Sequence, residues 1–455
     1  MYKNSIYILL HITVIEKNYN QLSILSIILF TYLDKCVIIS TMLLGIYEHK
    51  NLSKETTRRN FHMPSLSNRT DTFTESLIRK MTRISLENNA INLSQGFPDF
   101  DPPKVLMDRM AEVAYEDYHQ YAITWGSQRM REALAKKHEH FTGTKLNPDT
   151  NILVTCGSTE AMMCAMMTVC NIGDKVIVFS PFYENYGADA ILTGADPIYI
   201  PLNPPEFTFD PDVLEAAFKQ HPKAIILCNP SNPCGKVFTL DELKIIADFA
   251  EKYDTFVITD EVYEHIVYEP NKHIYFANLP GMFERTITCS SLSKTYSITG
   301  WRLGYIFAPE KIIDVAKKVH DFLTVGAAHP LMETVVTALE LGDDYYRDFL
   351  NVYQGKKDIF INGLKDLGLN YNDPQGAYYV LVDTSEFGVK NDVKFCEWLA
   401  REVGVGAVPG SSFFHENVNN YIRFHFAKND DTLYEALNRL STLKAKASLV
   451  KNGNY

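Results

Sequence analysis

From Thr72 onward, short apolar runs alternate with longer amphipathic stretches along the chain. The runs are rich in β-branched and aliphatic side chains and predict strands at Asn151–Thr155, Lys175–Phe179, Lys223–Cys228, Thr255–Asp260, Thr286–Ser290 and Leu303–Ala308. The intervening stretches, such as Leu240–Tyr253, predict helices. This alternation predicts an α/β fold with a mostly parallel central sheet that helices cover on both faces.

After about Pro330 the pattern changes to longer helices mixed with short strands. Helices are predicted at Glu333–Leu341 and Asp344–Leu367, and strands at Ala377–Val382 and Tyr421–Phe426. This mixture predicts a second, smaller α+β domain. We expect an N-terminal arm with part of the small domain over 63–110, the large domain over 111–330, and the rest of the small domain over 331–455.

Residues 1–62 have a different composition from the rest of the chain. They hold seven Lys/Arg and four Asp/Glu, whereas the whole chain holds 44 and 55 and has a net charge of −11. Their longer apolar run, Leu22–Tyr47, is interrupted by Asp34 and Lys35. Each of these charges would cost roughly 2.5 to 3.5 kcal/mol at the centre of a membrane-spanning helix. A secretory signal is also disfavoured, because His11 interrupts the first run and no small-residue cleavage site follows it.

We therefore expect residues 1–62 to lie outside the folded domains. Met63 opens a polar segment that is typical of a natural start, so a misassigned start codon is one explanation. A targeting segment or membrane anchor, and a structural role, are the alternatives. A mature N-terminus before Met42 would exclude the misassigned start.

Length and charge exclude several classes of protein. A chain of 455 residues with 46% hydrophobic residues can bury two or three domain cores, which excludes a disordered chain or a small disulfide scaffold. The acidic balance disfavours general nucleic-acid binding through a basic surface. The eight cysteines include no C-x-x-C pair, so we expect reduced thiols and a cytoplasmic protein.

Polar motifs follow several predicted strands, at the sheet edge where α/β proteins bind ligands. The motif CGSTEAM (Cys156–Met162) offers backbone N–H groups and the hydroxyls of Ser158 and Thr159 to an anion at a helix N-terminus. Helix capping by these hydroxyls explains the same motif equally well. The motif NPSNPCGKV (Asn229–Val237) places the amide of Asn232 just after another strand.

Charged residues occupy three further positions at or near strands. Asp260 ends an apolar strand and needs a partner there, which is a helix cap, a salt bridge or a protonated ring nitrogen. Lys294 follows another strand, and burial would lower the pKa of its amine and favour the nucleophilic form needed for a Schiff base. Arg423 lies in a strand of the smaller domain, where a carboxylate is its natural guest.

Together these motifs resemble the class I/II aminotransferases of fold type I, which use pyridoxal 5'-phosphate (PLP). The resemblance covers nearly all of residues 70–445 and rests on GST, PFY, NPxNPxG, DEVY, SxSKxxxxxGWRxGY and the late arginine. The segments INLSQGFPDFDPP (Ile91–Pro103) and QYAITWG (Gln120–Gly126) look most like the branch of methionine and kynurenine/glutamine aminotransferases.

The resemblance implies a role for each motif toward the cofactor. Lys294 would bind PLP covalently and move the proton at the substrate's Cα. Asp260 would pair with the pyridine nitrogen, and Asn232 and Tyr263 would bind the phenolic oxygen. Either Tyr183 or Phe182 can reach the ring face, and the spacing in the family favours Tyr183 for stacking. The phosphate would be held by Ser158, Thr159, Ser291, Arg302 and Tyr121.

The resemblance also implies a substrate site and a partner. Gly96, Asn232 and Arg423 would hold the substrate's carboxylate, with Trp125 and Phe97 as pocket walls. In this family the tyrosine matched by Tyr121 reaches the site of the neighbouring subunit, which implies a homodimer.

Dicarboxylate-specific members add a second arginine, and no arginine occurs between Arg302 and Arg347. We therefore expect an aminotransferase of amino-acid metabolism that moves the amino group of a neutral, sulfur-containing or aromatic L-amino acid to a 2-oxo acid. The alternatives are a PLP-dependent cysteine-S-conjugate β-lyase, an aspartate-type aminotransferase, and a sensing domain of a regulator. The last is disfavoured because residues 1–62 are too short and aliphatic for a DNA-binding domain.

Two other residue groups indicate no chemistry. His138 and His140 flank Glu139 without the i, i+4 spacing of zinc-binding histidines, so we expect a surface helix face and no metal site. Met162, Met163, Met166 and Met167 have helical spacing and are expected to fill the core.

Overall fold

The computed structural model describes residues 65–68, 71, 75–450, 453 and 455. The predictions for residues 1–62, including Cys36, lie outside these residues. The chain divides into two units, Met1–Asn68 and Arg69–Tyr455. The second unit contains all the helices and strands described below.

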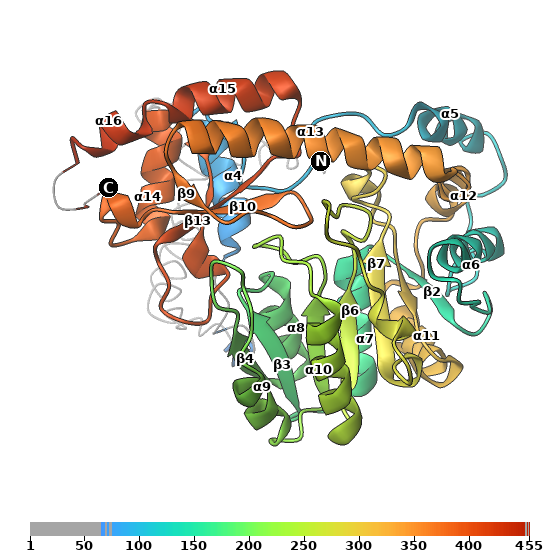
Figure 1. Cartoon of the computed structure of the whole chain (residues 1–455). Coiled ribbons are helices and arrows are strands. Elements are labelled where there is room, and N and C mark those ends of the chain that lie inside the picture. The colour runs from blue at the N-terminus through green and yellow to red at the C-terminus, as the bar shows by residue number, and fades with distance from the viewer. Residues whose placement is uncertain (1–64, 69–70, 72–74, 451–452, 454) are drawn as a thin grey trace, which may run out of the picture. The chain divides into compact units, whose positions relative to one another are not determined.

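A seven-stranded sheet forms the centre of the larger domain (Figure 1). Its order is β2-β8-β7-β6-β5-β3-β4, and the strands are β2 Ile152–Thr155, β3 Lys175–Ser180, β4 Asp196–Pro201, β5 Ala224–Cys228, β6 Phe256–Asp260, β7 Thr286–Ser291 and β8 Gly304–Phe307. Neighbouring strands run parallel, except that β8 is antiparallel to β2 and β7. The predicted mostly parallel sheet is therefore confirmed. The apolar pattern does not predict β4, because this edge strand (DPIYIP) contains two prolines.

Helices cover both faces of this sheet. They are α6 Gln128–Thr142, α7 Ser158–Val169, α8 Asn185–Thr193, α9 Pro211–Phe218, α10 Leu240–Lys252 and α11 Glu310–Thr324. Successive side chains of a strand point to opposite faces. Ile177 and Ile225 accordingly pack in one core cluster with side chains of α9 and α10, whereas Val176 and Ile226 pack in another with side chains of α7 and α11.

The smaller domain is built on a four-stranded antiparallel sheet of order β12-β13-β10-β9. Its strands are β9 Asn370–Tyr371, β10 Tyr379–Asp383, β12 Val408–Pro409 and β13 Tyr421–His425, and its helices are α13 Asp343–Asp366, α14 Asp392–Trp398, α15 Asp430–Leu440 and α16 Leu443–Ala447. The N-terminal part of the unit joins this domain, because β1 (Ile91–Asn92) pairs with β11 (Val405–Gly406) and α4 (Leu77–Glu87) packs beside them. Segments far apart in sequence therefore build one domain.

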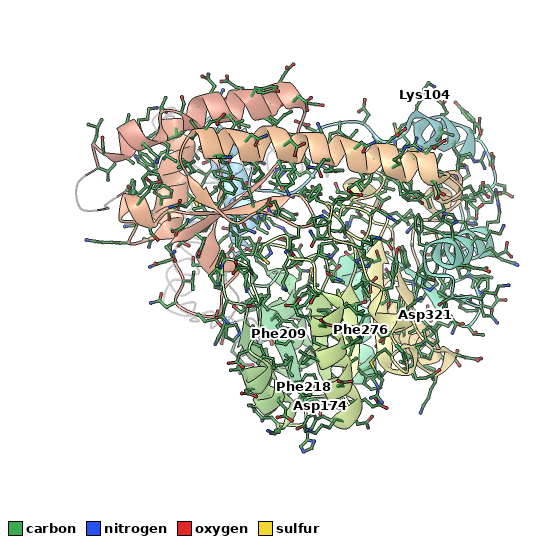
Figure 2. All side chains as sticks on the ribbon, viewed as in Figure 1. Lys104, Asp174, Phe209, Phe218, Phe276 and Asp321 are labelled. Carbon is green, nitrogen blue, oxygen red and sulfur yellow. The ribbon has the colours of Figure 1, made fainter. Side chains whose placement is uncertain are left out.

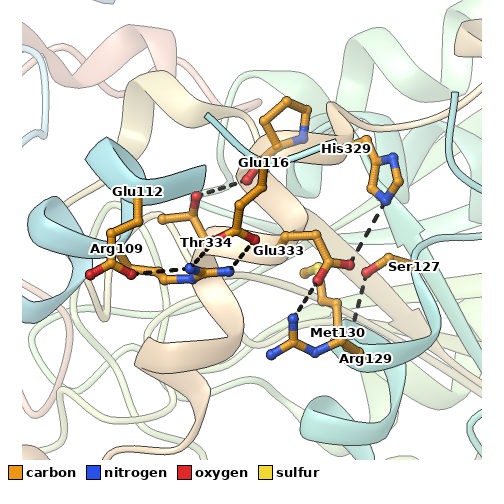
Figure 3. Close-up of polar contacts among 10 residues, drawn as sticks. Arg109, Glu112, Glu116, Ser127, Arg129, Met130, His329, Glu333 and Thr334 are labelled. Carbon is orange, nitrogen blue, oxygen red and sulfur yellow. Dashed lines mark hydrogen bonds and ion pairs between the residues drawn. The ribbon is translucent and has the colours of Figure 1, made fainter. Parts of the chain in front are cut away.

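Helix α12 (His329–Leu339) packs against α5 (Lys104–Val113) and α6. Polar contacts also join α12 to α6 (Figure 3). Arg129 of α6 donates to the Glu333 carboxylate of α12 at 3.0 Å, and the Glu333 side chain is only 3% exposed. The ring of His329 is hydrogen-bonded through Nδ1 to the carbonyl of Gln120 at 3.1 Å. The start of α12 therefore anchors the segment that precedes Tyr121.

Two side-chain predictions are partly wrong. His138 is not on an open surface, because its ring packs 5.1 Å from that of Phe307 and burial lowers its pKa to about 4; only His140 is exposed, and it pairs with Asp343 at 2.5 Å. In α7, Met162 and Met166 are buried, whereas Met167 is 46% exposed because its position on the helix faces away from the sheet.

The seven cysteines in the described part of the chain are free thiols, as predicted. In the same residues, no helix is long and apolar enough to cross a membrane.

Candidate functional site

Lys294 lies just beyond the end of β7, where the larger domain meets residues 94–97 and the smaller domain. Its Nζ donates to the carbonyl of Gly96 at 3.3 Å and lies 5.8 Å from the ring centres of Tyr263 and Tyr378. Burial lowers the pKa of the Lys294 amine, although Tyr379 and Asp260 oppose the shift. Lys294 itself is partly buried and its neighbours Ser293 and Thr295 are buried, so the predicted buried surroundings and lowered amine pKa are found.

Asp260 ends β6 and is 6% exposed. Tyr186 donates its hydroxyl to Oδ2 of Asp260 at 2.7 Å, and the Val262 N–H approaches Oδ1 at 3.4 Å. Burial raises the pKa of Asp260. Within the described residues no cation forms an ion pair with it, so the salt-bridge alternative is wrong. Tyr186 is a partner that the sequence analysis missed, although it stands one helical turn after Tyr183 in the same motif.

Tyr263, Tyr378 and Tyr379 form a cluster beside Lys294. The hydroxyls of Tyr263 and Tyr379 are hydrogen-bonded at 2.9 Å, and the rings of Tyr263 and Tyr378 meet edge to face at 5.3 Å. Tyr378 also donates to the carbonyl of Gly96 at 2.9 Å. A Cβ on Gly96 would overlap the hydroxyl of Tyr379, so only glycine lets this segment pass so close.

Arg423, on β13, is 1% exposed and reaches across to the larger domain. Its Nη1 donates to Oδ1 of Asn232, and its Nη2 to the carbonyl of Ser94, both at 2.7 Å. The guanidinium also lies over the rings of Tyr379 and Phe413 at 4.4 and 4.6 Å. Its Nε is buried without a partner in the described structure. A guanidinium with an unused donor is suited to bind a carboxylate.

The start of α7, Arg302 and the glycines between them form a compact group that we call the cradle. Gly157 is the N-cap and has no side-chain cap, so Ser158 and Thr159 are the first two helical residues and the simple capping explanation is wrong. Gly157 has a φ of +85°, and a Cβ there would overlap the guanidinium of Arg302. A Cβ on Gly304 would lie 2.5 Å from the carbonyl carbon of Gly157. The two glycines thus bring Arg302 against the positive end of the helix.

The remaining predicted residues lie around these groups. The Ser291 hydroxyl accepts a bond from the Ser293 N–H at 3.3 Å. The ring of Tyr183 packs edge to face on that of Tyr186, with 5.9 Å between ring centres. The ring of Phe182 instead stacks on that of Tyr199, with 5.1 Å between ring centres.

Trp125 and Tyr121 are not brought to Lys294 in this chain. Trp125 packs beside the core cluster of α7 and α11 with Lys317 Nζ 4.8 Å from its ring, and in the described structure it has no ring or polar contact with Lys294, Asp260 or Arg423. Tyr121 is 87% exposed.

Comparison with known proteins identifies the family of this chain. The family model described as aminotransferase class I and II matches residues 88–440. The kynurenine–oxoglutarate transaminase of Dictyostelium discoideum is 34% identical over 418 residues, which cover 83% of this chain and 96% of the relative. The methionine aminotransferase of Escherichia coli is 36% identical over 369 residues, which cover 81% and 96%.

The solved structure of N-succinyldiaminopimelate aminotransferase from Mycobacterium tuberculosis superposes with a TM-score of 0.81 at 33% identity, and the match covers 83% of this chain and 100% of that one. The match in sequence and fold thus spans the strands that carry Asp260 and Arg423 and the loop that carries Lys294. The chain therefore belongs to the class I and II aminotransferases.

Proposed function

We propose that the groups around Lys294 form the PLP site of this aminotransferase. Each group fits one part of the cofactor. The start of α7 with Arg302 and Ser291 suits the phosphate, and buried Asp260 suits a protonated pyridine nitrogen. We assign Asn232 and Tyr263 to the phenolic oxygen, and Tyr183 to the ring face. The single observation that carries the proposal is that the start of α7 with Arg302, the buried carboxyl group of Asp260 and the partly buried amine of Lys294 all lie at or just after strand ends of the large sheet.

Different residues of the chain have separate roles in the proposed reaction. PLP, when bound, supplies an electron sink for the electrons of a bond broken at Cα. We assign Lys294 as the base that removes and returns the Cα proton, and burial, which lowers the pKa of its amine, favours the neutral form that this role requires. Tyr186 holds Asp260 in place through the 2.7 Å hydrogen bond. The chemistry is transfer of an amino group between an amino acid and a 2-oxo acid.

We propose that Arg423, with Asn232 and Gly96, binds the substrate's carboxylate. The unpartnered Nε of Arg423 supports this role. The aromatic rings of Tyr379 and Phe413 beside the guanidinium favour a neutral, sulfur-containing or aromatic side chain. The names of the methionine and kynurenine relatives agree with this choice. Activity with aspartate well above that with methionine, phenylalanine and kynurenine would contradict it.

We also propose a homodimer in which Tyr121 contacts the cofactor phosphate of the neighbouring subunit. An apolar patch supports this: Tyr121 is 87% and Phe322 91% exposed, and Ile123 and Val325 are about half exposed. The two segments of the patch are adjacent, because His320 Nε2 lies 3.0 Å from the carbonyl of Thr124. The patch is also near α7, because the Cys156 thiol approaches the Gly326 carbonyl at 3.7 Å.

We propose that the enzyme acts in the cytoplasm. The free thiols of the described cysteines support this compartment.

The function is tested by an absorption spectrum of the purified protein, with a Lys294→Ala variant in parallel. We expect a visible band of bound PLP that shifts toward the ultraviolet when amino acids are added, and no covalently held cofactor in the variant. A protein without a cofactor band after incubation with PLP would contradict the proposal. Release of pyruvate and ammonia from a cysteine conjugate without an amino acceptor would reveal β-lyase activity.

A further inference from the structure

Residues 94–100 form a strap that passes beside Lys294. The Gly96 carbonyl accepts from Lys294 at 3.3 Å and from Tyr378 at 2.9 Å, and the Ser94 carbonyl accepts from Arg423 at 2.7 Å. The strap therefore contacts both the amine and the guanidinium of the proposed site. Its position should affect how an amino acid fits between them.

The far end of the strap is fastened to the start of α15. Oδ1 of Asp99 accepts from the Asn429 N–H at 2.6 Å, and Oδ2 accepts from the Thr432 hydroxyl at 3.4 Å. The amide of Asn429 donates in return to the Asp99 carbonyl at 3.1 Å. Asn429 is the N-cap residue of α15, but its side chain does not cap the helix. The Asp99 carboxylate thus sits at the positive end of a helix that is remote in sequence.

Two lysines of the smaller domain hold the neighbouring aromatic side chains. Lys428 Nζ lies 4.5 Å from the ring centre of Phe97 and donates to the Phe97 carbonyl at 3.5 Å. Lys356 Nζ lies 5.1 Å from the ring centre of Phe100. Lys428 is buried, so its contact with Phe97 is shielded from water. Contacts with the smaller domain thus hold the strap at Phe97, Asp99 and Phe100, and the Asp99 side chain provides the hydrogen bonds to the start of α15.

We propose that Asp99 is a positioning residue that keeps Gly96 and Phe97 in the arrangement that accepts the amino-acid substrate. The inference rests on the proposed function of Lys294 and Arg423. Without the hydrogen bonds of Asp99, the strap adopts the arrangement that accepts substrate for only part of the time. The apparent affinity for substrate falls by that fraction, while the bound complex reacts as before.

The test compares three variants of the PLP-loaded full chain. Asp99→Ala removes the fastening. Asp99→Asn keeps an oxygen acceptor for the Asn429 N–H, since asparagine serves as well as aspartate at helix N-termini. Asp431→Ala is the matched control, because this exposed residue lies in the first turn of the same helix and the described structure shows no side-chain contact between it and the strap. The measurements are KM and kcat for methionine, the spectral dissociation constant of an α-methyl amino acid, and the melting temperature.

For Asp99→Ala we expect KM and the dissociation constant to rise about tenfold with kcat within twofold, which corresponds to about 1.4 kcal/mol. Asp99→Asn should recover most of the loss, and Asp431→Ala should match the wild type. A lower melting temperature with unchanged KM would show a purely structural role and overturn the inference. A wild-type protein whose spectrum ignores every amino acid would instead overturn the proposed function.

Discussion

Asp260 of the proposed cofactor site and the nearby Asp189 are both buried carboxyl groups, and they differ in their partners. Asp260 receives a hydrogen bond from Tyr186, whereas Asp189, one turn further along α8, has a buried Oδ2 with no partner in the described structure. Burial, reinforced by the charge of Asp260, raises the pKa of Asp189 to about 8. Asp189 is therefore mostly protonated at neutral pH and does not act as a second carboxylate beside Asp260.

Replacement of this acid by a neutral amide should stabilise the protein in a pH-dependent way. The pKa of Asp189 is about 8 when folded and near the ordinary 3.8 when unfolded, so the folded state binds more protons between these values. Its contribution to stability is full below about pH 4 and is lost as the pH rises to 8. We expect the free energy of unfolding of Asp189→Asn, measured relative to wild type, to increase by roughly 2 to 4 kcal/mol when the pH is raised from 5 to 8. Denaturant unfolding at both pH values measures this, and an equal difference at both would contradict the assignment.

At the scale of elements, the start of α7 depends on backbone geometry rather than on hydroxyl caps. Gly157 adopts a φ of +85° and leaves room for the Arg302 guanidinium, which a Cβ would occupy. The strand-to-helix turn thus presents free N–H groups and a cation to one point. Neither the backbone N–H groups nor the contact with Arg302 requires a side chain at position 157.

A Cβ at position 157 should weaken PLP binding more than it lowers the stability of the fold. We expect Gly157→Ala to weaken PLP binding more than tenfold, because the Cβ displaces Arg302. Gly173→Ala is a matched control, since Gly173 has the same φ of +85° but no atom within 4 Å of the added Cβ. Both variants should lose about 1 kcal/mol of stability from the strained φ. Equilibrium titration with PLP measures the affinity, and equal losses in the two variants would contradict the cradle.

At the scale of the whole molecule, the site exists only where the two domains meet. Arg423 comes from the small sheet, Asn232 from the loop after β5, and Ser94 from the N-terminal strap, and hydrogen bonds join all three. The exposed patch around Phe322 and Tyr121 is the surface at which we propose that a second subunit binds.

A charge placed on that patch should separate the subunits. We expect the wild type to have twice the mass of the chain by light scattering, and Phe322→Asp to shift it toward the monomer with weaker PLP binding. Ile172→Asp is the control, because Ile172 is 86% exposed but lies in the turn between α7 and β3. A monomeric wild type that binds PLP fully would contradict the shared site.

The sequence by itself determined the strands, the main helices and the motifs at the strand ends, because local periodicity and turn residues encode them. Six strands of the large sheet were predicted within a residue or two, and Lys294, Asp260 and Arg423 followed from their positions in or after strands. The edge strand β4 was missed because its prolines mask the pattern.

Only the tertiary structure decided which distant residues meet. The hydrogen bonds of Tyr186 to Asp260, of Asn429 to Asp99 and of Arg423 to Asn232 join residues from 74 to 330 positions apart. The burial of His138 likewise depends on Phe307 of β8, a strand from a remote part of the chain. Periodicity shows which face of an element is apolar, whereas packing selects the partner that covers it and the polar groups that are left to bind a ligand.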